Sequence, residues 1–180
     1  GAILNGATVH LYSIPDNGLD NLSNWLVERN ITIIHMVPTV YRHFIKSLAE
    51  DQVFEYIRII DLGGEASFKS DFDHFKKHFT TNAFLVNDYG PTESTIVLQK
   101  FLSHQSELTR NSIPVGSLVE ETEVYILGEN NQQKGIYQEG EIVFKSNYLS
   151  LGYLNREELT AEVFTKDPIT GEGRVYKSGD

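Results

Sequence analysis

A nearly continuous apolar run from Ile31 to Val37, stopped by Pro38, is the feature that most restricts the fold of this chain. Strands covered on both faces, as in parallel sheets, have this character, whereas half-exposed strands alternate apolar and polar residues. Apolar residues at helical spacing follow directly; they are Tyr41, Phe44, Ile45 and Leu48. The order predicts a strand buried on both faces and then a helix, which is the start of a βαβ unit.

The same alternation continues on either side of this segment. We expect further strands over residues 8–12, 57–62 and 83–86. Another helix is predicted by four phenylalanines at helical spacing, which would place their rings on one core-facing stripe; they are Phe68, Phe72, Phe75 and Phe79. Repeated βα units favour a parallel sheet whose ligands bind beyond the carboxyl ends of the strands.

The second half of the chain has a different pattern. Short strands are predicted over residues 95–98, 123–127, 141–144 and 174–177, with turn-rich segments between them and a helix over residues 157–164. This spacing is typical of an antiparallel sheet or a distorted barrel. The predicted fold class is therefore α/β: parallel βαβ units over residues 1–93, followed by a smaller β-rich part over residues 94–180.

Composition excludes several function classes. Fifteen basic against 25 acidic residues give a net charge of −10, which disfavours nucleic-acid binding. The chain has no cysteine, so a disulfide scaffold, a thiolate zinc site and a cysteine nucleophile are excluded. It has no apolar run of membrane-spanning length and no signal-peptide pattern, so we expect a cytoplasmic protein that does not enter membranes. Because it begins without Met, we expect a piece of a longer protein.

Three segments fall where ligands are expected. The first, Asp61–Ala66, has two glycines directly after a strand, which lets another group approach the backbone. The second, Asn87–Ser94, offers an amide, an aromatic face, a rigid Gly-Pro turn, a hydroxyl and a carboxylate. The third, Tyr176–Asp180, ends in a carboxylate that could accept ribose hydroxyls. Taken alone, the first segment is more often a plain turn and the third a solvated carboxylate, and the second is equally compatible with a structural turn.

Taken together, the segments resemble the adenylation domains of nonribosomal peptide synthetases, within the acyl-adenylate-forming superfamily. Asn87–Glu93 resembles the N-x-Y-G-P-T-E motif of that family, and Tyr176–Asp180 resembles Y-[KR]-T-G-D. Between them, Gly140–Phe144 through Gly152–Leu154 resembles G-E-L…G-Y-L, followed by Asn155–Thr160. The resemblance covers nearly the whole chain. Its departures are Ser178 in place of Thr and a segment 145–151 without the usual Gly and Arg.

The resemblance implies a site for ATP or AMP with Mg²⁺. Gly63, Gly64 and Glu65 would lie along one face of the adenine, with Tyr89 stacked on the other. The remaining assignments are Asn87 to the base edge, Gly90 to the binding turn, Thr92 to the α-phosphate, Glu93 to Mg²⁺ and Asp180 to the ribose. Thr92 and Glu93 would be the catalytic pair, which acts by positioning and charge stabilisation.

The resemblance also implies a pocket for the side chain of a small carboxylic or amino acid. The positions assigned to it are His35, Asp61, Gly63, Asp88, Ile96 and Val97. Two carboxylates there would favour a cationic or hydrogen-bonding substrate group. Alternatively, Asp88 is a solvated loop residue and His35 a hydrogen-bonded core residue.

The function that this resemblance implies is formation of an acyl-adenylate, followed by transfer of the acyl group to the phosphopantetheine thiol of a carrier domain. The alternatives are an acyl-CoA or fatty-acyl-AMP ligase of the same superfamily, and a nucleotide-binding module without catalysis. The family's phosphate loop, hinge and C-terminal domain have no counterpart in the sequence. We therefore expect these 180 residues not to catalyse adenylation alone.

Overall fold

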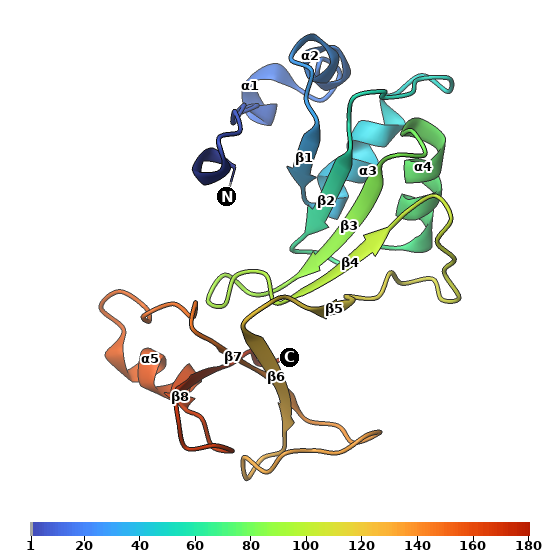
Figure 1. Ribbon diagram of the computed structural model, residues 1–180. Helices are drawn as coiled ribbons and strands as arrows, with labels where there is room; N and C mark the ends of the chain where they lie inside the picture. Colours follow the sequence, from blue (N-terminus) through green and yellow to red (C-terminus); the bar gives the residue numbers. More distant parts are fainter. Residues whose placement is uncertain (1) are drawn as a thin grey trace. The chain divides into compact units, whose positions relative to one another are not determined.

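The computed structural model describes residues 2–180, which divide into two compact units. Among the described residues, unit 1 comprises residues 2–85 and 102–112, and unit 2 comprises residues 86–101 and 113–180. Figure 1 shows the helices and strands of both units in chain order, coloured along the sequence. The sequence-based division at residue 93 stays a prediction.

Helices and short strands alternate in the first half of the chain, and strands dominate the second half (Figure 1). The helical elements are η1 (Ile3–Asn5), α1 (Ile14–Asn17), α2 (Leu22–Glu28), α3 (Pro38–Lys46), α4 (Lys69–His78) and α5 (Glu157–Val163). The strands are β1 (Ile33–Met36), β2 (Ile59–Gly63), β3 (Phe84–Tyr89), β4 (Leu98–Leu102), β5 (Ser117–Leu118), β6 (Thr122–Leu127), β7 (Glu141–Ser146), β8 (Phe164–Lys166) and β9 (Arg174–Lys177).

The strands form two sheets of different character. The first has the order β1-β2-β3-β4-β5; β1 and β2 are parallel, whereas β4 and β5 are antiparallel. The second has the order β6-β7-β9-β8 and is antiparallel throughout. The predicted α/β class, with parallel units followed by antiparallel sheet, is confirmed.

Three of the four phenylalanines of the predicted stripe form much of the unit 1 core: Phe72 and Phe75 lie in α4 and Phe79 directly follows it, whereas Phe68, which precedes the helix, is half-buried. Phe72, Phe75 and Phe79 are each at most 2% exposed, and Phe75 stacks on both of its neighbours at centroid distances of 5.9 and 5.8 Å. α3 packs against β2 and α4, and its Tyr41 and Phe44 are fully buried. Burial of these aromatic side chains supplies the main hydrophobic stabilisation of the unit.

Two expectations for unit 1 are wrong. Residues 8–12 do not form a strand, and Leu11 is 89% exposed. Within the described residues that segment has no strand partner; Tyr12 instead meets the edge of the Trp25 ring at 5.0 Å. β1 is also not buried on both faces, because Ile33 is 51% exposed and, among the described residues, β1 lies at the edge of its sheet with β2 as its neighbour.

Unit 2 is organised around the antiparallel sheet. Phe144 of β7 and Val175 of β9 are fully buried, and Tyr176 stacks on Phe144 at 6.5 Å. α5 follows the predicted helix and packs against β8 and β9. The strand expected at residues 95–98 instead begins at Leu98, because Thr95 adopts a positive φ of 59° that interrupts extended structure.

No helix within residues 2–180 is both long and apolar enough to cross a membrane.

Candidate functional sites in the two units

The predicted site residues fall in both units. Unit 1 holds His35, Asp61, Gly63, Gly64 and Glu65. Unit 2 holds Asn87, Asp88, Tyr89, Gly90, Thr92, Glu93, Ile96, Val97 and Asp180.

In unit 1, parallel pairing brings His35 and Asp61 together. They lie opposite each other in β1 and β2, and His35 Nδ1 is 2.9 Å from Asp61 Oδ2. The other carboxylate oxygen of Asp61 is buried and has no hydrogen-bond partner among the described residues. Buried polar atoms are normally satisfied, so this oxygen is a place where a donor from a ligand would be accepted.

The glycine pair that ends β2 makes the turn that sequence reasoning expected. Gly64 has a φ of +82°, which L-side chains rarely adopt, and Gly63 is buried. The Glu65 carboxylate turns toward the start of α3, where Oε2 accepts hydrogen bonds from Thr39 N at 2.9 Å and Thr39 Oγ1 at 2.6 Å. These bonds lower the pKa of Glu65 and satisfy a first-turn N–H of the helix.

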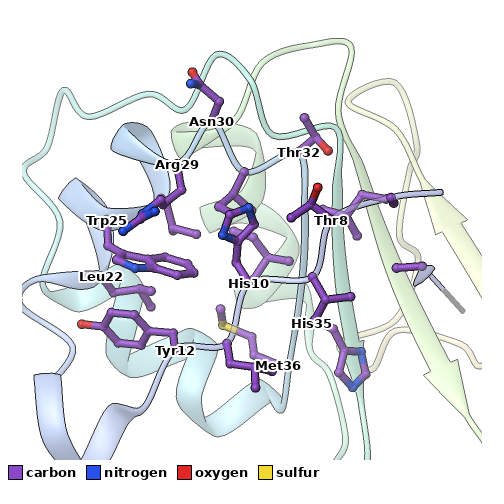
Figure 2. Close-up of a pocket in the computed structure, with 18 of the residues that line it drawn as sticks. Thr8, His10, Tyr12, Leu22, Trp25, Arg29, Asn30, Thr32, His35 and Met36 are labelled. Atoms are coloured by element: carbon purple, nitrogen blue, oxygen red, sulfur yellow. The ribbon is translucent and has the colours of Figure 1, made fainter.

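A pocket of about 690 Å³ lies within unit 1, lined by residues between Ala2 and Val40. Figure 2 shows Trp25, Tyr12 and His10 gathered together, with His35 apart from them. His35 is the one predicted site residue among its lining residues.

In unit 2, Tyr89 and Asp180 meet although they are 91 residues apart in sequence. The Tyr89 hydroxyl donates to Asp180 Oδ2 at 2.7 Å. Burial, followed by the Asp180 carboxylate, raises the pKa of Tyr89 to about 12, so the phenol remains a neutral donor near pH 7. The backbone of Asp180 is held as well, because its carbonyl accepts from Ile142 N at 3.1 Å.

The turn after β3 depends on a glycine. A Cβ at Gly90 would lie 1.8 Å from the Thr95 carbonyl oxygen, so no other residue fits without moving the backbone. The turn is closed by Ser94 N donating to the Pro91 carbonyl at 3.0 Å. This geometry leaves Thr92 exposed and Glu93 half-buried.

Glu93 is held at both its backbone and its side chain. Ser150 N donates to its carbonyl at 2.7 Å, and the Tyr153 hydroxyl donates to Oε1 at 2.6 Å. None of the ion pairs within residues 2–180 involves Glu93. Sequence reasoning did not identify Tyr153 as a hydrogen-bond partner of Glu93. The G-Y-L motif that contains Tyr153 was the signal that could have indicated it.

The other predicted residues of unit 2 are mostly buried. Asn87 Nδ2 donates to the Pro114 carbonyl at 3.2 Å, and Asp88 Oδ1 accepts from Gln99 Nε2 at 2.9 Å. Val97 is fully buried in the cluster around Phe144, whereas Ile96 is 38% exposed. The roles assigned to these side chains from the sequence stay predictions.

The described residues contain no group of three or more His, Asp or Glu side chains arranged to hold a metal ion. A cation here would need ligands from its substrate in addition to a single carboxylate, which is a common arrangement for Mg²⁺.

Comparison with known proteins agrees with the fold and the motifs. The sequence pattern described as "AMP-binding enzyme" matches residues 1–154, so the chain belongs to the AMP-binding enzyme family. Its relatives are peptide synthetases. It is 35% identical to surfactin synthase subunit 1 of Bacillus subtilis and 30% identical to gramicidin S synthase 1 of Brevibacillus brevis.

The alignments cover 100% and 99% of this chain but 5% and 16% of those two synthetases, respectively. Among solved structures, PA1221, described as a synthetase protein containing adenylation and PCP domains, superposes with a TM-score of 0.79 at 26% identity. That match covers 100% of this chain and 36% of PA1221. The chain therefore spans a small part of the relatives that it matches.

Proposed function

We propose that this chain supplies nucleotide- and acid-binding residues to a domain that adenylates a carboxylic or amino acid with Mg-ATP. The observation that carries the proposal is the hydrogen bond between Tyr89 and Asp180, because it joins the two family-like motifs within one unit. The family match and the synthetase relatives support the same conclusion.

In the proposed site, residues of unit 2 bind the nucleotide. Tyr89 offers a ring for stacking on adenine, and Asp180 offers a carboxylate for the ribose hydroxyls. Asn87 would contact the base edge, and the turn at Gly90 would present the exposed Thr92 hydroxyl to the α-phosphate. The resemblance also assigns Gly63, Gly64 and Glu65 to the adenine, and this assignment is proposed from the sequence motifs alone.

Glu93 is the residue that fits Mg²⁺. Its carboxylate is a hard oxygen ligand, and a neutral phenol orients it without cancelling its charge. When bound, the ion would neutralise negative charge on the phosphates.

The proposed chemistry needs no protein nucleophile. A carboxylate oxygen of the acid attacks the α-phosphorus of ATP, and the bond to the β-phosphate oxygen breaks to release pyrophosphate. The phosphopantetheine thiolate of a carrier domain then attacks the acyl carbonyl, and AMP leaves. The chain's residues act through positioning and charge stabilisation. A cytoplasmic location belongs to the same proposal.

Recognition of the acid is proposed for His35, Asp61 and Gly63 in unit 1, and for Asp88, Ile96 and Val97 in unit 2. The strongest support is at Asp61, whose buried Oδ1 lacks a partner among the described residues. An ammonium, guanidinium or amide group of the substrate would satisfy it.

The test is acid-dependent exchange of pyrophosphate into ATP by the full-length protein. The panel contains amino acids, keto acids, aryl acids and fatty acids. Exchange with a polar or basic amino acid supports the proposal. Exchange with fatty or aryl acids alone would indicate the ligase alternative, and no exchange by a folded protein would contradict adenylation.

A further inference from the structure

The loop after β7 contacts Glu93 at two points. Ser150 N donates a hydrogen bond to the Glu93 carbonyl oxygen at 2.7 Å, and the Tyr153 hydroxyl donates one to the carboxylate oxygen Oε1 at 2.6 Å. One bond holds the backbone and the other holds the side chain. The Tyr176 hydroxyl also interacts with the Glu93 carboxylate and with Tyr153, so Tyr153 sets the direction of the carboxylate together with Tyr176.

Tyr153 is itself held by α5 and β8. Its backbone N–H donates to Thr160 Oγ1 at 2.9 Å, and that hydroxyl donates onward to the Arg156 carbonyl at 2.8 Å. Its ring meets the edge of the Phe164 ring at a centroid distance of 5.8 Å. A residue fixed at both its backbone and its ring can hold a partner in one orientation.

Gly152 allows this arrangement. Its φ is +143°, and a Cβ there would lie 2.3 Å from Thr160 Cγ2. Any larger residue would push α5 away from the loop and disturb the bond between Thr160 and Tyr153. Gly152 and Thr160 therefore act together to hold Tyr153, and through it the Glu93 carboxylate, in place; these three residues are called the Tyr153 support.

The charge of Glu93 is preserved by this support. The Tyr153 hydroxyl donates to the Glu93 carboxylate, and a phenol carries no positive charge. A lysine or arginine in the same place would offset the carboxylate charge, whereas a neutral phenol orients the carboxylate and leaves it anionic.

We propose that Tyr153 is a positioning residue that directs the Glu93 carboxylate toward the divalent cation of the adenylation reaction. This inference rests on the proposed function. Hydrogen bonds to a ligating carboxylate typically change metal affinity by roughly 10–100-fold when they are removed.

The test is Tyr153→Phe in the full-length protein, which removes the hydroxyl and keeps the ring. Mn²⁺ replaces Mg²⁺, and α,β-methylene ATP, which cannot release pyrophosphate, replaces ATP. The nucleotide alone also binds Mn²⁺, so a titration without protein is the baseline. The additional loss of the free Mn²⁺ signal in electron paramagnetic resonance gives the affinity of the site without catalysis. We expect binding about 10-fold weaker or more. The acid KM and the thermal unfolding midpoint should stay near the wild-type values.

The matched control is Tyr148→Phe. Tyr148 lies on the same loop, and its hydroxyl donates to the surface carboxylate of Glu121 at 2.7 Å. Both substitutions remove a tyrosine hydroxyl that donates to a glutamate carboxylate, but in Tyr148→Phe that glutamate is not Glu93. Unchanged Mn²⁺ affinity in this variant, with weaker binding in Tyr153→Phe, supports the proposal.

Glu93→Gln separates failure of this inference from failure of the proposed function. If Glu93→Gln weakens Mn²⁺ binding and a folded Tyr153→Phe binds as the wild type does, the role of Tyr153 is overturned and the metal role of Glu93 stands. If Glu93→Gln also binds as the wild type does, the metal role itself fails. Should Tyr153→Phe not fold, Thr160→Val tests the same support: a smaller loss in Mn²⁺ affinity supports the inference, and no loss overturns it.

Discussion

Arg42 donates two hydrogen bonds to the fully buried carboxylate of Asp71, from Nε to Oδ1 at 2.8 Å and from Nη2 to Oδ2 at 2.9 Å. The pair connects α3 to α4, and Asp71 also accepts from Phe68 N at the start of α4. Such a fork-shaped pair is stronger than a single charged contact. It is a structural element of unit 1.

Loss of the Arg42 charge should destabilise unit 1. In Arg42→Met the aliphatic stem is kept, but Asp71 is left charged and buried without its cation. We expect the free energy of local unfolding to fall by about 3 kcal/mol. Hydrogen exchange of α3 and α4 peptides in the full-length protein measures it.

Lys69→Met is the control for this change, because Lys69 pairs with the half-exposed Asp73 in the same helix. Exposed pairs of this kind contribute less than about 0.5 kcal/mol. Equal effects of the two variants would contradict the structural role given to Arg42.

Tyr89→Phe should weaken ATP binding without abolishing it. The ring for stacking is kept, but the bond that orients Asp180 is lost. Hydrogen bonds to charged groups are worth about 1.5 kcal/mol or more, so the ATP KM should rise about 10-fold. Steady-state exchange at saturating acid and Mg²⁺ measures this change.

Tyr89→Ala should raise the ATP KM further than Tyr89→Phe, because the stacking surface is lost as well. Tyr12→Phe is the control: its hydroxyl donates to the Gly18 carbonyl in unit 1, and its loss should leave the ATP KM unchanged. A Tyr89→Phe enzyme with the wild-type KM would remove the support that this pair gives to the proposed function.

The sequence was sufficient for elements whose burial follows from local spacing. The stripe that includes Phe72 and Phe75 predicted α4 because a helix repeats its face every three to four residues. Residues 8–12 show where prediction from local residue patterns fails. Their β-branched pattern favours a strand, but a strand needs a partner, and within the described residues that segment has none.

In the candidate sites, too, the sequence predicted some features and missed those that depend on tertiary contacts. Motif resemblance placed Tyr89 and Asp180 in one site, and the structure brings them into contact. It did not reveal that Tyr153 holds Glu93 or that Glu65 turns to Thr39. These contacts depend on how loops approach one another, which no local periodicity encodes.

Asp61→Asn should change which acids are activated. The amide preserves the shape and can still accept a bond from His35, but the negative charge is lost. For an acid with a cationic side chain, we expect kcat/KM to fall about 10-fold or more relative to a neutral acid. The exchange panel measures the ratio, with the exposed Asp51→Asn as control. An unchanged ratio would show that Asp61 takes no part in substrate choice.

Asp167 makes unit 2 sensitive to acid. Burial raises the pKa of its carboxyl group. The ion pair with Lys145 at 2.8 Å and the hydrogen bonds from Thr170 and the backbone N–H of Ile169 lower it by more, so the pKa lies below its ordinary value of 3.8. The unfolded chain therefore takes up the proton first as the pH falls. The stabilisation is fully present above the ordinary pKa and is lost as the pH falls through the lower pKa of the folded state.

Asp167→Asn should consequently destabilise unit 2 at pH 7, and its deficit relative to the wild type should stay constant down to about pH 5 and shrink below about pH 4. Hydrogen exchange of β7 and β9 peptides, corrected for the intrinsic rate at each pH, follows this difference. Asp73→Asn, at a half-exposed carboxylate in unit 1, should show almost no deficit in these peptides at any pH. A deficit of Asp167→Asn that is as large at pH 3 as at pH 7 would mean that the lost shape of the carboxylate matters, and not its charge.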